Sequence, residues 1–366
     1  MNNSAFQFLA VLTIFSFTII SCGKDNENVL NDKDIPTTYS FENVSYAGQT
    51  ARLDMLQAMT SYMKTANTVD VQVSASKLRD MFANENNPFE NADLNTATKQ
   101  IRNKIFESHI PKFETYMDAL AELSGNTNDA SAGTAGVATS GSKSYLLNAN
   151  GVEYTQLIEK GLMGALNYYQ VCEKYTRDEK IGNDIDNTEV TEGKGTKMEH
   201  HWDEAFGYVG ANVEMDGEGY RYHGKYSGKG EELLKTRTNL FQSFLAGRAA
   251  ISAKDMVRKD DEAKKVRKYM ELTTVTTAIH YLNGGKTNFA DYAKRCHGLS
   301  EAYAFVGSLK YNGDSKISSA DLDVVLSNME NIEGNPDFAN ITITDLNNTI
   351  NALSAVYSLD DIKDSL

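Results

Sequence analysis

Proline is almost absent from this chain, and its scarcity constrains the fold more than any other feature of the sequence. Only four prolines occur in 366 residues, and none lies between Pro111 and Pro336. Proline removes a backbone donor and clashes with the preceding helical turn, so long helices need stretches without it. The long proline-free stretch therefore favours an all-α fold.

Apolar residues recur every three or four positions along much of the chain, which is the spacing of amphipathic helices. Leu53, Leu56, Met59 and Met63 show it clearly. The pattern predicts about eight substantial helices and no convincing series of strands. The expected helices lie at about 53–66, 93–123, 152–175, 198–213, 229–251, 254–282, 286–309, 318–332 and 343–357. Residues 217–228 are expected to form a short hairpin or an aromatic loop, and 124–144 a flexible surface loop.

The N-terminal segment is almost entirely apolar from residue 5 to residue 20, and Ile19-Ile20-Ser21-Cys22 stand at its end. This ending resembles the lipobox of bacterial lipoproteins, although no Lys or Arg precedes the apolar run. The segment therefore predicts a signal peptide over 1–21 and lipidation of Cys22. A flexible polar tether is expected over 22–36. The expected location is the outer membrane, with the periplasmic or surface face left open.

The formal net charge of −14 argues against a nucleic-acid partner, because a phosphate backbone would repel an acidic surface. Besides Cys22 the chain contains only Cys172 and Cys296. These two cysteines could form a disulfide in an oxidising envelope or remain as two buried thiols.

An internal repeat is the most informative local feature. The stretch HHWDEAFGYVG (200–210) aligns without a gap with HGLSEAYAFVG (297–307). His200 then matches His297, and Glu204 matches Glu301. The repeat predicts a duplication with two related helical halves, 37–215 and 228–366.

The spacing within the repeat places a histidine and a glutamate one helical turn apart, where both can reach one divalent metal ion. Two facing helices could then supply four ligands, as carboxylate-rich helix bundles do. His201 forms a competing pair with Glu204, and spacing alone does not choose between the two histidines. The predicted metal residues are His200, His201, Glu204, His297 and Glu301, with Asp203, Glu153 and Arg248 in support. Alternatively, the pairs are hydrogen bonds that hold packed helices together.

Two of the supporting residues have separate expected roles. Arg248 follows a glycine in an apolar setting and is expected to pair with a buried carboxylate. Glu153 is expected either to join the ligands across the bundle or to be an ordinary exposed or capping acid. Trp202 is expected to be a core or interface anchor.

Residues 310–326 resemble a calcium loop, with Asn312, Asp314 and Asp321 at ligand positions. Lys310, however, occupies the first ligand position, where a cation opposes calcium binding. Calcium is therefore not expected. The sequence instead favours a turn followed by a helix that Ser318 or Ser319 caps.

The motif His201-Trp202-Asp203-Glu204 resembles the Gly-x-His-x-x-Glu hallmark of imelysin-like, iron-regulated envelope proteins, with Glu199 in place of the glycine. The chain is also similar to an uncharacterised lipoprotein domain family that neighbours the imelysins. The stretches that carry this second resemblance are 37–56, 151–166, 199–210, 245–255 and 297–312.

These resemblances imply a two-part helical bundle and a function in iron or haem uptake, with iron or another divalent metal bound. The candidate partners are an outer-membrane receptor and an imelysin-like protein. Peptidase activity is not expected, because the chain lacks a convincing third ligand and general base. The alternative function is a metal-free surface lipoprotein that docks to a transporter as an accessory subunit.

Overall fold

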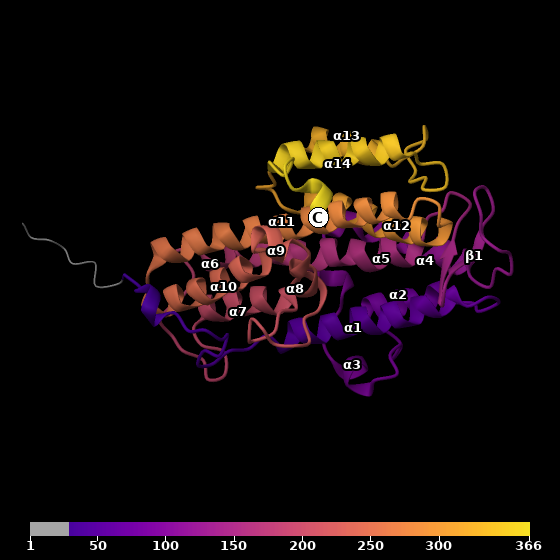
Figure 1. Ribbon diagram of the computed structural model, residues 1–366. Helices are drawn as coiled ribbons and strands as arrows, with labels where there is room; N and C mark the ends of the chain where they lie inside the picture. The colour runs from indigo at the N-terminus through magenta and orange to yellow at the C-terminus, as the bar shows by residue number, and fades with distance from the viewer. Residues whose placement is uncertain (1–28) are drawn as a thin grey trace, which may run out of the picture.

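The computed structural model describes residues 29–366, which are mostly helical (Figure 1). The predicted all-α class is confirmed. The predicted signal peptide and Cys22 lie outside the described residues. The α-helices are α1 (Ala47–Lys64), α2 (Ala75–Ala83), α3 (Ala92–Thr96), α4 (Ile110–Leu123), α5 (Tyr154–Leu162), α6 (Asp178–Ile181), α7 (Lys197–Val209), α8 (Tyr222–Tyr226), α9 (Glu231–Leu234), α10 (Thr236–Ala253), α11 (Met256–Thr287), α12 (Tyr292–Ser308), α13 (Ser319–Ser327) and α14 (Ile343–Tyr357).

Helix α11 is the central element of the fold. Its 32 residues correspond to a length of about 48 Å at the usual rise per residue. Helices α10 and α12 pack along it, and α14 also contacts it. In Figure 1 α11 runs through the middle of the molecule, and α13 and α14 form the upper layer.

Helices from the two parts of the repeat pack against each other. Helix α7 lies against α10, and α5 lies against α12. The buried apolar side chains of the described residues form one core cluster, which contains Leu56 and Trp202 as well as Phe305 and Leu353. The predicted halves thus share a core, and their origin by duplication stays a prediction.

Helix α5 continues into two π-helical segments, Met163–Tyr168 and Gln170–Tyr175. A π-helix is wider than an α-helix and rare, and it is frequently found at functional sites. Here the π-helical segments contact α7, α8 and α12. The sequence predicted a helix over 152–175 but contained no sign of its widening.

A β-hairpin lies where the sequence predicted a flexible loop. Strands β1 (Gly136–Ser140) and β2 (Lys143–Leu147) pair antiparallel, with Ser140 opposite Lys143. A turn of two residues joins them, and Gly141 adopts a φ of 60°, which glycine tolerates best. Leu146 and Leu147 are buried, so the hairpin packs on the core.

Two of the predicted helices are interrupted. Within 93–123 the chain forms α3 and α4 with short 3₁₀ turns between them, and the Asn84 amide donates to the carbonyl of Leu94 in α3 and to those of Ala97 and Lys99 just after it. Within 229–251 the chain changes direction at Lys235, whose φ is 53°. The segment 217–228 forms the short helix α8 and a 3₁₀ turn.

The end of the expected tether contacts the bundle. The backbone nitrogen of Leu30 donates to Asp255, and Asp32 lies 3.1 Å from Arg258. Ile35 packs on the core cluster. Asp255, which caps α11, and Arg258 in the first turn of α11 thus hold the end of the tether against the bundle.

No helix within residues 29–366 has the length and apolar character that a membrane span requires. Cys172 and Cys296 are both buried and free, which decides between the two alternatives for this pair.

The contact between α7 and α10 depends on a glycine. The Trp202 indole is fully buried and donates a hydrogen bond to the carbonyl of Phe244 over 3.0 Å. A Cβ atom at Gly247 would lie 2.0 Å from the indole ring. The predicted role of Trp202 as a core anchor is confirmed, and Gly247 provides the space for it.

Substitution of Gly247 by alanine is expected to lower the free energy of unfolding by about 2 kcal/mol or more, because the added methyl group overpacks the contact. Gly284 lies within α11 with no atom near its Cβ position. Gly284→Ala is therefore the control and should raise stability by about 0.5–1 kcal/mol through helix propensity. Urea unfolding measures both, and equal effects would contradict the close approach at Gly247.

Candidate functional site

Helix α7 carries the HHWDE motif and begins with a capping box. The Glu199 nitrogen donates to the Thr196 hydroxyl over 3.2 Å, and the Glu199 carboxylate accepts from the Thr196 nitrogen over 2.8 Å. This reciprocal pairing satisfies two backbone donors at the start of the helix. Glu199, which replaces the glycine of the hallmark motif, therefore has a structural role in this chain.

One face of α7 forms a buried ion-pair network with α10. Arg248 is 1% exposed and donates to Asp203 over 3.0 Å and to Glu199 over 2.7 Å. Asp203 also accepts the Tyr39 hydroxyl hydrogen over 2.8 Å. Burial raises the pKa of Asp203 to about 7, although Arg248 and the bond from Tyr39 act in the opposite direction. The predicted pairing of Arg248 with a buried carboxylate is confirmed.

The other face of α7 carries the first predicted ligand pair. The Nδ1 atom of His201 lies 2.6 Å from the carbonyl oxygen of Lys180. A carbonyl oxygen only accepts, so Nδ1 carries the hydrogen. Burial lowers the pKa of His201 against the effect of that bond, and the neutral ring leaves Nε2 as an acceptor. Glu204 accepts a hydrogen bond from Gln49 over 2.7 Å. The buried Nδ1 of His200 has no partner among the described residues.

The second predicted pair has different neighbours. The Nδ1 atom of His297 lies 2.6 Å from the Glu153 carboxylate, and the ring stacks on Tyr145 at 4.3 Å. Burial alone would lower the pKa of His297, but the bond and charge of Glu153, together with Glu301, raise it. Glu153 thus lies across the bundle beside a predicted ligand.

Glu301 itself is an ion-pair partner of a buried lysine. The Lys160 ammonium lies 3.3 Å from Glu301 and 2.8 Å from Glu159. Burial would lower the pKa of Lys160, but the two carboxylates raise it. Lys160 thus lies beside Glu301, where the predicted metal ion was expected.

The two pairs do not form the shared site that the repeat predicted. Within residues 29–366, no three His, Cys, Asp or Glu side chains are grouped so that they could hold a metal ion. The physical reason is that Gln49 pairs with Glu204 and Lys160 pairs with Glu301. The metal-binding role of the five predicted residues therefore stays a prediction.

A polar cavity of about 530 Å³ lies beside the first pair. Its walls come from the segment 102–110, from the second π-helical segment and from α6. Four cationic side chains line it, together with two acidic side chains, two tyrosines and Gln170. These charged and aromatic residues are Arg102, Lys104, Glu107, Tyr169, Lys174, Tyr175, Glu179 and Lys180.

The cavity adjoins the HHWDE motif directly. Lys180 accepts the His201 hydrogen bond through its carbonyl and lines the cavity with its side chain. Tyr175 also lines the cavity, and its ring centre lies 6.1 Å from that of His201. Burial raises the pKa of Tyr175, and the charge of Glu204 adds to the effect. His201 and Glu204 therefore lie behind the cavity wall.

Lys104 is the cation of this cavity that lacks an acidic partner among the described residues. Arg102 lies 3.3 Å from Glu114, whereas Lys174 and Lys180 lie 3.5 Å and 3.8 Å from Glu179. Burial lowers the pKa of Lys104, and Arg52 lowers it further, while Glu204 opposes them. A half-buried ammonium without an adjacent anion is electrostatically unfavourable. A bound anion would remove that cost.

The sequence did not point to Lys104 or to the other cavity lysines. They come from three separate segments, and no spacing pattern relates them. Gln170 and Tyr175 belong to the second π-helical segment, Tyr169 directly precedes it, and all three line the cavity. Gln170 also donates to the Lys104 carbonyl over 2.5 Å and holds the two segments together.

In the loop that resembles a calcium site (310–326), the Asp314 carboxylate forms ion pairs with arginines. Asp314 pairs with Arg177 and lies 3.2 Å from Arg267. The Ser318 hydroxyl caps α13 by accepting from the Asp321 nitrogen over 3.1 Å. The predicted turn and serine-capped helix are confirmed.

Comparison with known proteins gives one match. The family model described as "Domain of unknown function (DUF4856)" matches residues 36–360. No curated protein and no solved structure matches the chain. The expected membership of an uncharacterised domain family is confirmed, and the resemblance to imelysins stays an expectation.

Lys160→Met is expected to lower the free energy of unfolding by about 3 kcal/mol or more, because Glu301 would lose its buried cation. Adding Glu301→Leu should recover much of this loss, because the isolated carboxylate is then absent. Lys64, whose side chain is 47% exposed, also pairs with Glu159, and Lys64→Met serves as the control with a loss below about 1 kcal/mol. A double variant no more stable than Lys160→Met would contradict the ion-pair role of Glu301.

Proposed function

The chain belongs to the DUF4856 family, and from that premise we propose that it is a lipid-anchored envelope protein that binds a small anionic ligand in the cavity beside α7. The ligand is an iron chelate that carries free carboxylates, and the protein takes part in its uptake. The iron is cargo and enters within its own chelate, because the described residues offer no complete ligand set for a bare ion.

The observation that carries this proposal is the electrostatic state of Lys104. Lys104 is half-buried in a polar cavity, forms no ion pair with a carboxylate of the described residues, and has a lowered pKa. The chain as a whole carries a net charge of −14, so a cavity lined by four cations has a local charge opposite to that of the whole chain. Such a reversal attracts an anion from solution and selects against cations.

The cavity has the further groups that orientation of a chelate needs. Lys174, Lys180 and Arg102 line the same cavity, and their ion pairs with Glu179 and Glu114 are partly exposed, so these cations can also bind carboxylates of a ligand. Gln170 adds a donor on the π-helical wall, because its amide has a second hydrogen besides the one that it donates to the Lys104 carbonyl. The volume of about 530 Å³ lies in the range of small-molecule sites.

Iron enters the proposal through the resemblance of His201-Trp202-Asp203-Glu204 to the imelysin motif. His201 and Glu204 act from behind the wall: His201 fixes the backbone of Lys180, and Glu204 lies beside Tyr175 and Lys104. In this proposal the motif positions the cavity residues and does not coordinate a bare metal ion.

The alternative is a metal-free accessory subunit that docks to a transporter. A specific observation favours it: His201, Glu204, His297 and Glu301 all have partners within the protein. Hydrogen-bonded pairs of this kind would hold the helices of a docking module together. If the cavity binds no anion, the function of an accessory subunit is favoured over ligand binding.

Lys104→Gln is expected to weaken binding of citrate and of ferric citrate about tenfold or more, because one charge-assisted contact to a carboxylate is lost. Isothermal titration of residues 29–366, purified without a chelator, measures both ligands. Lys99→Gln is the matched control, since Lys99 belongs to the same region but does not line the cavity.

Two results would overturn the proposal. One is the absence of saturable citrate and ferric citrate binding. The other is binding of ferrous, ferric or zinc ions alone that Glu204→Gln abolishes and Lys104→Gln leaves unchanged. The second result would restore the metal site on α7.

Lipid anchoring through Cys22 has its own test. The full chain, expressed in a Gram-negative host with labelled palmitate, should incorporate the label and fractionate with the outer membrane. Cys22→Ser should remove the label and release the protein from the membrane fraction. A labelled Cys22→Ser protein, or an unlabelled wild type, would contradict the anchor.

A further inference from the structure

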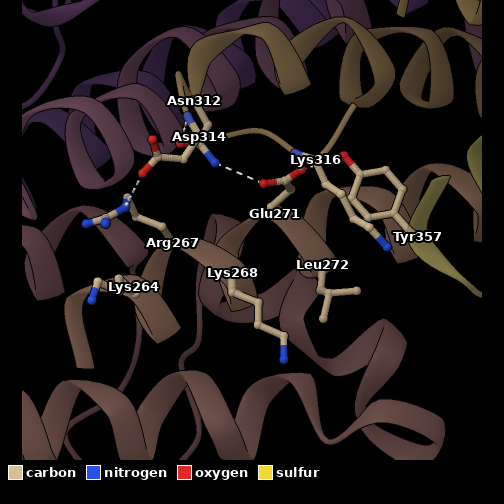
Figure 2. A pocket seen from close by; sticks show the side chains of 9 residues that line it. All are labelled: Lys264, Arg267, Lys268, Glu271, Leu272, Asn312, Asp314, Lys316 and Tyr357. Atoms are coloured by element: carbon tan, nitrogen blue, oxygen red, sulfur yellow. Dashed lines mark hydrogen bonds and ion pairs between the residues drawn. The ribbon is translucent and has the colours of Figure 1, made fainter. Parts of the chain in front are cut away.

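A second cavity, of about 370 Å³, lies between α11, the loop 310–317 and α14 (Figure 2). Four cations line it: Lys264, Arg267 and Lys268 on α11, and Lys316 on the loop. Residues three and four positions apart share one face of a helix, so the three cations of α11 face the same side.

A buried carboxylate holds the walls of this cavity in place. Glu271 is 5% exposed and accepts hydrogen bonds from Asn312 and Ser315, each over 2.9 Å. It also accepts from the Lys316 nitrogen over 2.7 Å and from the Tyr357 hydroxyl over 2.5 Å. These four donors join α11 to the loop and to α14. The cavity is therefore preformed, and the acceptors of Glu271 are occupied.

The other acid of the cavity is also engaged. Asp314 pairs with Arg177 and Arg267, as Figure 2 shows for Arg267. Lys264 lies 3.3 Å from Asp261. Lys268 and Lys316 differ from these residues, because neither has an acidic partner within residues 29–366. Their ammonium groups lie instead 5.2 Å and 5.8 Å from the ring centres of Tyr269 and Tyr357.

The wall between these two lysines is apolar. Figure 2 shows Leu272 between the side chains of Lys268 and Lys316, with the Tyr357 ring beside them. A ligand that fits this surface combines a dianionic head group with an apolar or aromatic group. A phosphate monoester has this combination.

We propose that this cavity binds an organic phosphate monoester, whose phosphate is bound by Lys268 and Lys316 and whose apolar group packs against Leu272 and Tyr357. The site is separate from the cavity of Lys104 and does not depend on the function proposed for it. A soluble aryl phosphate and the head group of a phosphatidic acid share the required chemistry.

The test is isothermal titration of residues 29–366 with phenyl phosphate, inorganic phosphate and dihexanoyl phosphatidic acid. Phenyl phosphate should bind at least ten times more tightly than inorganic phosphate. Lys268→Glu/Lys316→Glu should weaken phenyl phosphate at least tenfold. The control Lys143→Glu/Lys194→Glu changes the net charge equally at two exposed lysines outside the cavity and should bind as wild type does.

Leu272→Ala is a second variant that separates the two parts of the site. It should weaken phenyl phosphate but not inorganic phosphate. Tighter binding of the phosphatidic acid than of phenyl phosphate would identify a lipid as the source, and the reverse order would identify a soluble ester. No saturable binding, equal affinity for inorganic phosphate, or an unchanged affinity of the Lys268→Glu/Lys316→Glu variant would overturn the proposal.

Discussion

An ion that moves from water into the interior of a protein must find opposite charge and hydrogen bonds there, and this requirement organises the structure. Three buried charged side chains contact partners from distant parts of the chain. Arg248 connects α10 with α7, Lys160 connects α5 with α12, and Glu271 connects α11 with α14 and the loop before α13. Breaking a pair of this kind leaves an isolated charge in the interior, which is more costly than the pair is favourable.

The same requirement explains why Glu204 and Glu301 of the repeated His/Glu pairs have protein partners. A glutamate on the packed side of a helix needs a partner, and a metal ion and a protein cation are alternative solutions. The structure contains the second solution at Glu301, where Lys160 is the partner, and a neutral donor at Glu204, where Gln49 is the partner. Both solutions place histidine and glutamate at the same helical spacing, so the repeat is compatible with either.

Cations without an acidic partner then indicate where an anion from solution could bind. Most charged side chains of the described residues near the two cavities are paired, and Lys104, Lys268 and Lys316 are exceptions, of which Lys104 is half-buried and the other two are exposed. Each lies in a cavity wall of a strongly acidic protein. None of these three cations forms an ion pair with a carboxylate of the described residues, so an anion from solution would not have to displace one, and the two cavities differ in the polarity of the remaining wall.

The sequence by itself determined the helical class and the position of several helices, because apolar periodicity is a local property of the chain. Helix α14 has the predicted bounds, and the serine cap of α13 was readable from its spacing. The hairpin at 136–147 could have been found from the Gly-Ser turn between Thr139 and Ser144, where short strands flank it. Only the tertiary structure decided the breaks at Lys235 and before α4, the π-helical wall, and the partners of Glu204 and Glu301. These features depend on contacts between residues far apart in the chain, and local spacing carries no information about which distant side chain meets a buried charge.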